Sequence, residues 1–438
     1  MLNVKGLCFG GLRVYFALYM LRHLLPFLVL STFVGCTAQP AEHVREPLRS
    51  GPWRLALDLN GQELPFLFDL HHDTSGYHLL LHNGEEKIVV DDILLSGDSV
   101  HIRMPLFDSE FRGVLEGDSS VTGLWCNYLQ GPDYRVPFSA TAGASPRFAK
   151  RSTGATASLH GQWEVHFSPG SEDAYDALGL FRMEKDLLTG TFGTETGDYR
   201  FLEGTMEGDS LRLSCFDGSH AFLFKAVLRN DSLIGRYWSG IHWREPWVAV
   251  RNPDFRLRDP DSLTFLKEGH DMVDFTFPTI DGGTVSPTDK DHAGRVQMVQ
   301  VMGSWCPNCV DETMLLDELY DTYHHKGLEV MAIAFEKNPD PTKAVAALKR
   351  FRDKLGVKYP IAYAGEASKE NSSAQLPFLN HLMSYPTCIF IDKAGKVRRI
   401  RTGFYGPGTG EHYLNYKRNL DSFIQQLLAE NPAAAATR

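Results

Sequence analysis

The chain has 438 residues, a formal net charge of −10 and seven cysteines. This length predicts two or three domains. The acidic balance, with no basic cluster to offset it, argues against a nucleic-acid partner. Seven cysteines at scattered positions are too few for a disulfide framework.

Residues 1–36 have the layout of a bacterial secretory signal peptide, since from Met20 a short charged start precedes an apolar core and small residues. Met20 is a candidate for the true start, because residues 1–19 only lengthen a complete signal. The segment ends in Phe-Val-Gly-Cys36, which resembles a lipobox with phenylalanine in place of the usual leucine. We therefore expect Cys36 to carry lipid and to anchor the mature protein to a membrane of the bacterial envelope, on the periplasmic side. The alternative, a transmembrane anchor, needs a longer apolar run than residues 24–34.

After a polar tether at 37–50, residues 51–252 contain an internal repeat whose offset stays between 110 and 113 residues. The copies span 51–145 and 155–252. Each alternates apolar and polar residues between Gly-Asp-Ser or Asn-Asp-Ser turn formers, which is typical of antiparallel strands. The sequence therefore predicts an antiparallel all-β domain made by duplication, folded as a barrel or a sandwich.

Tryptophans recur through both copies, and we expect most of them to pack in the core. The alternative is that they line a ligand cavity. The cluster His242–Glu245 is the first place to look for a ligand or a docking surface. The tryptophans of the two copies are Trp53, Trp125, Trp163, Trp238, Trp243 and Trp247.

Residues 253–268, with alternating arginine and aspartate, are predicted to be a linker. From 269 to 432, helix-patterned segments alternate with apolar strands and end in a hairpin and a closing helix. This order predicts an α/β domain with a mixed sheet.

Trp305-Cys306-Pro307-Asn308-Cys309 lies between the apolar strand 296–302 and a helix-patterned segment. A thiol at the start of a helix meets unpaired N–H groups that favour its thiolate. We therefore expect Cys306 to attack a disulfide and buried Cys309 to resolve the mixed disulfide. Pro307 presets φ near the helix start, and Asn308 adds no charge.

Seventy-seven residues after Cys309, Tyr385-Pro386 precedes the apolar strand 387–391. Proline in mid-strand would remove a ladder hydrogen bond, so Pro386 should mark the start of the strand. An X–Pro bond can adopt the cis form at modest cost, and such a bond usually has a purpose in a folded protein.

Together, these two segments resemble the thioredoxin fold, and more narrowly the TlpA/ResA-like thiol–disulfide oxidoreductases. Phe277-Pro-Thr-Ile-Asp281-Gly282-Gly283 is similar to the opening of their domain, and Glu312 stands three residues after the second cysteine, as in that family. Thioredoxins proper have a buried carboxylate where this chain has Gln300, which leaves Glu312 as the expected proton acceptor for Cys309.

The resemblance implies that the proline loop is cis, faces the cysteine pair and receives the extended chain of the substrate. Besides catalytic Cys306, Cys309, Glu312 and Pro386, it implies a set of substrate-contacting residues. These are Trp305, Pro307, Asn308, Tyr385 and Thr387.

The expected function is thiol–disulfide exchange, in the reducing direction, with exported cysteine-containing proteins, including apocytochromes awaiting haem. The resemblance implies a membrane dithiol as electron donor and no cofactor beyond the redox-active Cys306–Cys309 pair. Three alternatives remain. A zinc site lacks a second ligand pair, a peroxiredoxin-like peroxidase would need a threonine where Gly303 stands, and a scaffold or ligand-binding lipoprotein would use the domain only for docking. Pairing of Cys126 with Cys215 is disfavoured.

Overall fold

The computed structural model describes residues 48–149, 158–185 and 187–431. The predicted signal peptide with Met20, the lipobox cysteine Cys36 and most of the tether lie outside these residues. Within them, no helix combines the length and the apolar character that crossing a bilayer requires.

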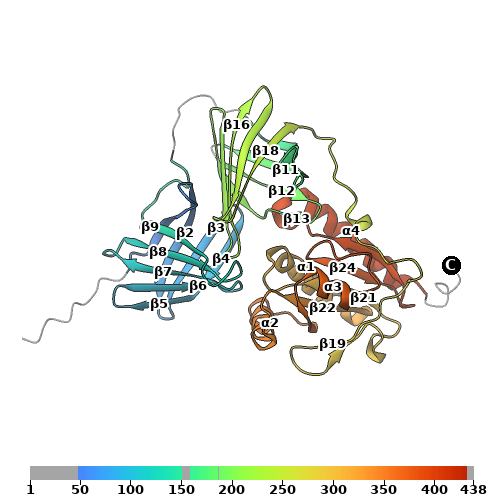
Figure 1. Cartoon of the computed structure of the whole chain (residues 1–438). Coiled ribbons are helices and arrows are strands. Elements are labelled where there is room, and N and C mark those ends of the chain that lie inside the picture. The colour runs from blue at the N-terminus through green and yellow to red at the C-terminus, as the bar shows by residue number, and fades with distance from the viewer. Residues whose placement is uncertain (1–47, 150–157, 186, 432–438) are drawn as a thin grey trace, which may run out of the picture. The chain divides into compact units, whose positions relative to one another are not determined.

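The first copy forms one antiparallel sheet in the order β4-β3-β2-β1-β9-β8-β7-β6-β5 (Figure 1). Its end strands, β4 and β5, are not paired with each other, so the sheet stays open. The strands are β1 (Gly51–Asp58), β2 (Glu63–Asp73), β3 (Gly76–Asn83), β4 (Glu86–Val90), β5 (Asp92–Ser96), β6 (Ser99–Arg103), β7 (Ser109–Leu115), β8 (Ser120–Asn127) and β9 (Arg135–Ala142).

The second copy forms a sheet in the order β11-β10-β18-β17-β16-β15-β14-β12-β13, and an additional pairing of β11 with β12 closes it into a barrel. Closure removes the exposed strand edges. The strands are β10 (Gly161–Phe167), β11 (Tyr175–Glu184), β12 (Leu187–Thr194), β13 (Gly197–Asp198), β14 (Leu202–Glu207), β15 (Ser210–Phe216), β16 (Ala221–Arg229), β17 (Ser232–Ser239) and β18 (Trp243–Arg251).

The predicted duplicated all-β region is therefore confirmed, with one curled sheet for each copy rather than one barrel built from both. The reason is that the first and last strands of each copy pair with each other. β1 pairs with β9 through Trp53–Ala142, and β10 pairs with β18 through Trp163–Arg251. Each copy consequently forms a sheet of its own, open in the first copy and closed in the second.

The core of the first copy is completed by side chains of the second. Phe216, Ala221 and Leu223 from β15 and β16 are buried in the same apolar cluster as the first copy's side chains. The Phe216 ring stacks on Phe66 with centroids 4.6 Å apart, and buried Asn83 exchanges hydrogen bonds with the backbone of Phe216 at 2.8 and 3.3 Å. The two copies are therefore not independent folding units.

Four of the repeat tryptophans are core residues, as expected: Trp53, Trp125, Trp163 and Trp247 are at most 2% exposed. Trp243 differs, because it is 44% exposed. Trp238 is partly buried against the first copy's core, and the cysteines at 126 and 215 are buried and unpaired with each other.

The C-terminal domain has a five-stranded sheet in the order β23-β22-β21-β24-β25. β21 and β22 pair in parallel and are buried along their whole length, as expected for a sheet covered on both faces. Its main elements are β21 (Val296–Met302), α1 (Pro307–Tyr323), β22 (Leu328–Glu336), α2 (Pro341–Leu355), β23 (Ile361–Glu366), α3 (Lys369–Gln375), β24 (Thr387–Ile391), β25 (Val397–Thr402) and α4 (Glu411–Ala429).

Smaller elements precede and connect these strands. The short strands β19 (Phe277–Pro278) and β20 (Thr284–Val285) pair as a ribbon, and four 3-10 turns complete the domain: η1 (Pro260–Ser262), η2 (Lys290–His292), η3 (His324–Lys326) and η4 (Pro407–Thr409). The second half of the predicted linker is part of this domain. Asp261 pairs with Arg401 of β25 at 3.1 Å, and buried Thr264 accepts a hydrogen bond from Thr402 at 2.8 Å.

Candidate active site

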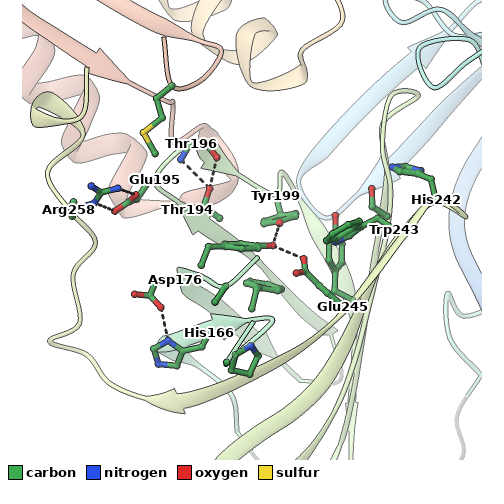
Figure 2. Close-up of a pocket in the computed structure, with 18 residues that line it drawn as sticks. His166, Asp176, Thr194, Glu195, Thr196, Tyr199, His242, Trp243, Glu245 and Arg258 are labelled. Carbon is green, nitrogen blue, oxygen red and sulfur yellow. Dashed lines mark hydrogen bonds and ion pairs between the residues drawn. The ribbon is translucent and has the colours of Figure 1, made fainter. Parts of the chain in front are cut away.

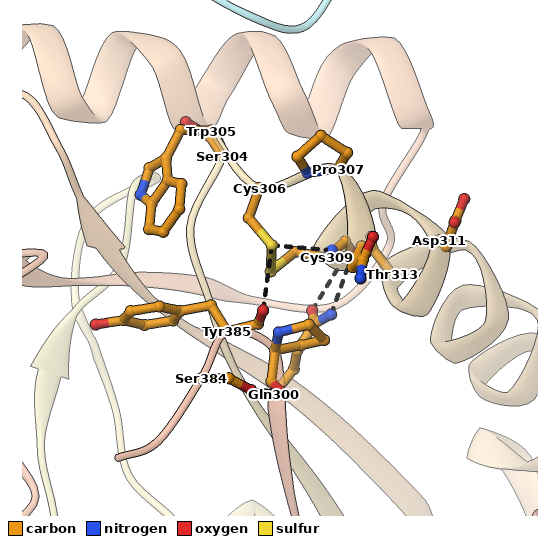
Figure 3. The surroundings of a disulfide bond; sticks show 12 residues. Gln300, Ser304, Trp305, Cys306, Pro307, Cys309, Asp311, Thr313, Ser384 and Tyr385 are labelled. Carbon is orange, nitrogen blue, oxygen red and sulfur yellow. Dashed lines mark hydrogen bonds between the residues drawn. A yellow bond between two sulfur atoms is a disulfide. The ribbon is translucent and has the colours of Figure 1, made fainter. Parts of the chain in front are cut away.

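Two cysteines close a disulfide at the point where the sheet gives way to helix α1 (Figure 3). β21 ends at Met302, and α1 begins at Pro307, whose missing N–H costs nothing in the first helical turn. Cys306 is the N-cap residue, and its sulfur accepts a hydrogen bond from the Cys309 N–H at 3.2 Å. Cys306 is 6% exposed and Cys309 is fully buried, which is the asymmetry expected of an attacking and a resolving thiol.

The Tyr385–Pro386 peptide bond is cis and lies against the disulfide. The carbonyl oxygen of Tyr385 is 3.5 Å from the Cys306 sulfur. The topology explains this proximity, because β24 runs antiparallel to β21 and pairs Thr387 with Val301, close to the end of β21 that leads into the cysteines. The Thr387 hydroxyl holds the loop by donating to the Ser384 carbonyl at 2.9 Å.

Trp305 forms a partly buried wall beside the cysteines. Its indole N–H donates to the Phe335 carbonyl at 2.9 Å, and its ring meets the Tyr385 ring edge-on at 5.4 Å. Gly303 makes room for this packing, since a Cβ there would lie 2.3 Å from the indole nitrogen. A threonine at 303, which the peroxidase alternative requires, does not fit this arrangement.

Glu312 is buried inside α1, and burial raises the pKa of its carboxyl to about 8; Gln300 and the charge of Arg401 offset this only in part. The Gln300 amide donates to the Cys309 carbonyl at 3.3 Å and accepts from the Thr313 hydroxyl at 3.0 Å. A carboxyl with this pKa exchanges a proton near neutral pH, which suits a base for a buried thiol.

Comparison with known proteins agrees with this geometry. Residues 269–400 match the model of the AhpC/TSA family. Thiol-disulfide oxidoreductase ResA of Geobacillus thermodenitrificans is 28% identical over 140 residues, which is 32% of this chain and 72% of the relative. The protein of the same name from Bacillus anthracis is 27% identical over 132 residues, covering 30% and 68%. The C-terminal domain is a thioredoxin-like thiol–disulfide oxidoreductase domain.

Among solved structures, a putative thiol:disulfide interchange protein DsbE from Chlorobium tepidum is 21% identical, with a TM-score of 0.30, and the match covers 38% of this chain and 100% of that one.

A second buried carboxyl supports the active-site loop of the oxidoreductase domain. Glu336, at the end of β22, accepts hydrogen bonds from the Ser304 N–H and hydroxyl, both at 2.7 Å. Burial raises the pKa of Glu336 to about 7, although these hydrogen bonds lower it. Sequence reasoning missed this residue. The available signal was its position at the carboxyl end of a buried parallel strand, on the same edge of the sheet as the cysteines.

The β region covers the residues between the two cysteines. The Asn308 side chain donates to the Asp198 carbonyl at 3.2 Å, and Arg200 donates to the Pro307 carbonyl at 3.3 Å. Pro307 is buried and Asn308 is partly buried. The structure thus places these two predicted substrate contacts against the chain's own second copy, while Trp305 and Tyr385 line the other side of the disulfide.

Arg200 joins three parts of the chain. Its guanidinium forms ion pairs with Glu86 of the first copy and Asp311 of α1, and it lies 4.0 Å from Asp217 of the second copy. Burial raises the pKa of Asp311 to about 7, against the pull of Arg200. Glu86 and Asp311 each lie more than 100 residues from Arg200 in sequence, so no local pattern could predict these two ion pairs.

A cavity of about 1010 Å³ opens in the second copy (Figure 2). It is lined by residues between 166 and 176, 194 and 199, and 237 and 245, together with Arg258 and with Met383 of the oxidoreductase domain. His242, Trp243 and Glu245 of the polar–aromatic cluster are among them, so that cluster does border a cavity. A metal ion has no candidate site there or elsewhere in the described residues, since no group of three or more His, Cys, Asp or Glu is suitably arranged.

Proposed function

We propose that this protein reduces disulfides of exported proteins at the bacterial cell envelope. The observation that carries the proposal is the Cys306–Cys309 disulfide at the start of α1, with the cis Tyr385–Pro386 bond against it. A disulfide at a helix start, with its first cysteine less buried than its second and a cis-proline loop against it, is an arrangement suited to protein thiol–disulfide exchange. The ResA relatives, named as thiol–disulfide oxidoreductases, support the same chemistry.

The reaction starts from the dithiol form. The Cys306 thiolate attacks one sulfur of the substrate disulfide, and the other substrate sulfur leaves as a thiolate that takes up a proton. The Cys309 thiol then loses its proton and attacks the Cys306 sulfur, which breaks the mixed disulfide and releases the second substrate thiol. Two electrons pass to the substrate, and the chain is left with the Cys306–Cys309 disulfide.

Glu312 supplies the base for the second step. Cys309 is fully buried, so its thiol needs a nearby acceptor to ionise. The carboxylate form of Glu312, which is present at useful levels because its pKa is about 8, takes that proton. Gln300 keeps the first helical turn in place through its bond to the Cys309 carbonyl.

The reducing direction is supported by what surrounds Cys306. Its thiolate is stabilised by one backbone N–H and the helix terminus, without a cationic residue between the cysteines. A weakly stabilised thiolate favours the disulfide form over the dithiol form. We therefore expect the Cys306–Cys309 couple to have a reduction potential below about −200 mV. A membrane dithiol of the kind that TlpA/ResA-like proteins use would return the electrons.

Assay of the full-length protein tests this proposal. We expect the wild type to catalyse insulin reduction with a dithiol donor, and Cys306→Ser to lower the rate to background. Cys388→Ala is the matched control, because this third cysteine of the oxidoreductase domain is buried and outside the disulfide. Cys309→Ser should trap exported proteins as mixed disulfides on Cys306. Wild-type protein that is inactive at every redox poise would instead favour the scaffold alternative.

The envelope location rests on the N-terminal segment and is tested separately. We expect the protein to sediment with membranes, and Cys36→Ala to release it into the soluble envelope fraction. A variant that stays membrane-bound would contradict the lipid anchor without affecting the redox proposal.

A further inference from the structure

The cavity of the second copy is not used by the chemistry described above. Its wall is aromatic, with Tyr199 and Tyr237 rings 5.3 Å apart. Glu245 lies in this wall and is 3% exposed. Its carboxylate accepts hydrogen bonds from the Ser168 hydroxyl at 2.6 Å and the Tyr175 hydroxyl at 2.8 Å. The wall therefore combines ring faces with a buried carboxylate.

Within the described part of the chain, Glu245 forms no ion pair with a lysine, arginine or histidine. The other acids at the rim have partners: Asp176 pairs with His166 at 2.7 Å, and Glu195 pairs with Arg258. A buried carboxylate that has only neutral hydrogen-bond donors attracts a cation, and aromatic faces add to the attraction. The cations that polypeptides offer are lysine and arginine side chains.

The cavity also borders the redox centre. Met383 lines it and precedes Tyr385, whose carbonyl faces the Cys306 sulfur, by two residues. Thr196 lines it on another side, two residues before Asp198, whose carbonyl binds Asn308.

The side of the cavity that carries His242 approaches Trp305. Burial lowers the pKa of His242, and the nearby charges of His220 and Lys337 lower it further. The Lys337 ammonium lies 4.5 Å from the centre of the Trp305 ring. Trp305 and Tyr385, the two rings beside the disulfide, are thus both close to residues that adjoin the cavity. Met383 joins the proline loop to the cavity wall, so a polypeptide that leaves Cys306 along that loop is directed toward the cavity.

We propose that this cavity is the substrate-recognition site of the oxidoreductase domain, and that it takes an extended polypeptide segment with a lysine or arginine side chain near the cysteine that Cys306 attacks. The basic side chain lies against the tyrosine rings of the wall and meets Glu245. This inference rests on the proposed function, because it assigns a substrate class to the same cysteine pair.

Two peptides that differ in one residue test the proposal. Each carries a single cysteine in a mixed disulfide with a chromogenic thiol, and either lysine or glutamine three residues away. The second-order rate constant for their reduction is measured with the full-length dithiol protein. We expect the wild type to prefer the lysine peptide by about 10- to 100-fold, and Glu245→Gln to lower the ratio below about threefold. The ratio is internal, so a general loss of activity cancels.

Two further variants sharpen the result. Trp243→Ala, at an exposed cavity residue, should also lower the ratio. Because it changes the cavity at a different position, it keeps the proposal testable if the Glu245 variant misfolds. Glu116→Gln, at an exposed acid of the first copy, should leave the ratio at the wild-type value. Equal rates for the two peptides with the wild type, or a ratio that Glu245→Gln does not change, would overturn the assignment of the cavity.

A binding measurement separates this proposal from the redox function. If the wild type reduces neither peptide, the reductase proposal fails. Fluorescence anisotropy with cysteine-free versions of the peptides then decides about the cavity. Lysine-dependent binding that Glu245→Gln weakens tenfold or more would support recognition of basic segments, and equally weak binding of both peptides would exclude it.

Discussion

The β region and the active site of the oxidoreductase domain differ in whether their buried charged side chains form ion pairs. In the β region, buried arginines pair with acids: Arg147 with Glu203, and Arg200 with Glu86. At the active site, the buried carboxyl of Glu312 has no ion-pair partner among the described residues. A paired charge holds elements together, whereas the Glu312 carboxyl, which has no counter-ion, keeps a raised pKa and can exchange protons.

Glu245 differs from the other buried acids named above for the β region. It lies in the β region, yet it lacks a cationic partner within the described structure, as Glu312 does. In both places the acid borders a site that we assign to function, namely the cysteine pair and the cavity. Glu312 and Glu245 are thus two buried acids without an ion-pair partner in the described structure, and each borders a site that we assign to function.

The largest expected effect is the loss of stability when the buried ion pairs of Arg200 are removed. Arg200→Met leaves Glu86, Asp217 and Asp311 buried around a missing cation, and we expect it to lower the free energy of unfolding by about 3 to 5 kcal/mol. Urea denaturation of the full-length protein measures this loss. Adding Asp311→Asn should restore part of it. A loss below about 1 kcal/mol would mean that the cluster is not a support.

Removing the Glu312 carboxyl should instead raise the free energy of unfolding at high pH. The folded-state pKa, about 8, lies above the unfolded value near 4.5, so the folded state holds the proton more tightly and stability falls as pH rises between these values. We expect the wild type to lose stability between pH 5 and 9, and Glu312→Gln to reduce this loss by about 2 to 4 kcal/mol.

The measurement is the urea midpoint and slope at each pH. Glu318→Gln, at an exposed acid of the same helix, is the matched control and should keep the wild-type slope. An unchanged slope in Glu312→Gln would show that its carboxyl titrates normally.

Glu312→Gln should also slow the resolution of the mixed disulfide, by about 10- to 100-fold at neutral pH, because Cys309 loses its proton acceptor. Stopped-flow measurement of peptide reduction follows this step. In the wild type we expect the rate to rise with pH through about 8 as Glu312 ionises, and we expect the variant to lack that inflection. Equal rates and equal pH profiles would remove Glu312 from the mechanism.

The smallest effect is expected where a pair is exposed. Arg229 forms an ion pair with Asp209 at the surface, with the two side chains 62% and 48% exposed. Solvent screens such pairs, so Arg229→Met should leave the urea midpoint unchanged within error. A clear shift would show that burial is not what separates supporting pairs from the rest.

Local patterns predicted most of the fold. The alternation of apolar residues predicted the strands of both copies, and the spacing of Cys306 and Cys309 ahead of a helix predicted the disulfide. The cis bond at Pro386 was implied by the resemblance to the thioredoxin fold, which itself rests on short local motifs. Each of these depends on residues that are close in sequence.

Long-range features could not be predicted in the same way. Arg200 meets Glu86 and Asp311 only after folding, and nothing near it in sequence specifies either partner. That each copy forms its own sheet depends on pairing between its first and last strands. Trp243 is a tryptophan like those of the core, but it lies at the cavity rim. Residue type alone could not predict this, because it does not determine which end of a barrel stays open.

The segment from Thr194 to Arg200 is seven residues long and is fastened at both ends. Thr194 belongs to the cavity wall, and Arg200 is tied to α1 through Asp311. A segment this short can absorb little movement of either end. A shift of a few tenths of an ångström at the recognition end must be taken up within those residues or be transmitted to the turn of helix that carries the sulfurs, which makes the loop a mechanical link between what is bound and what reacts.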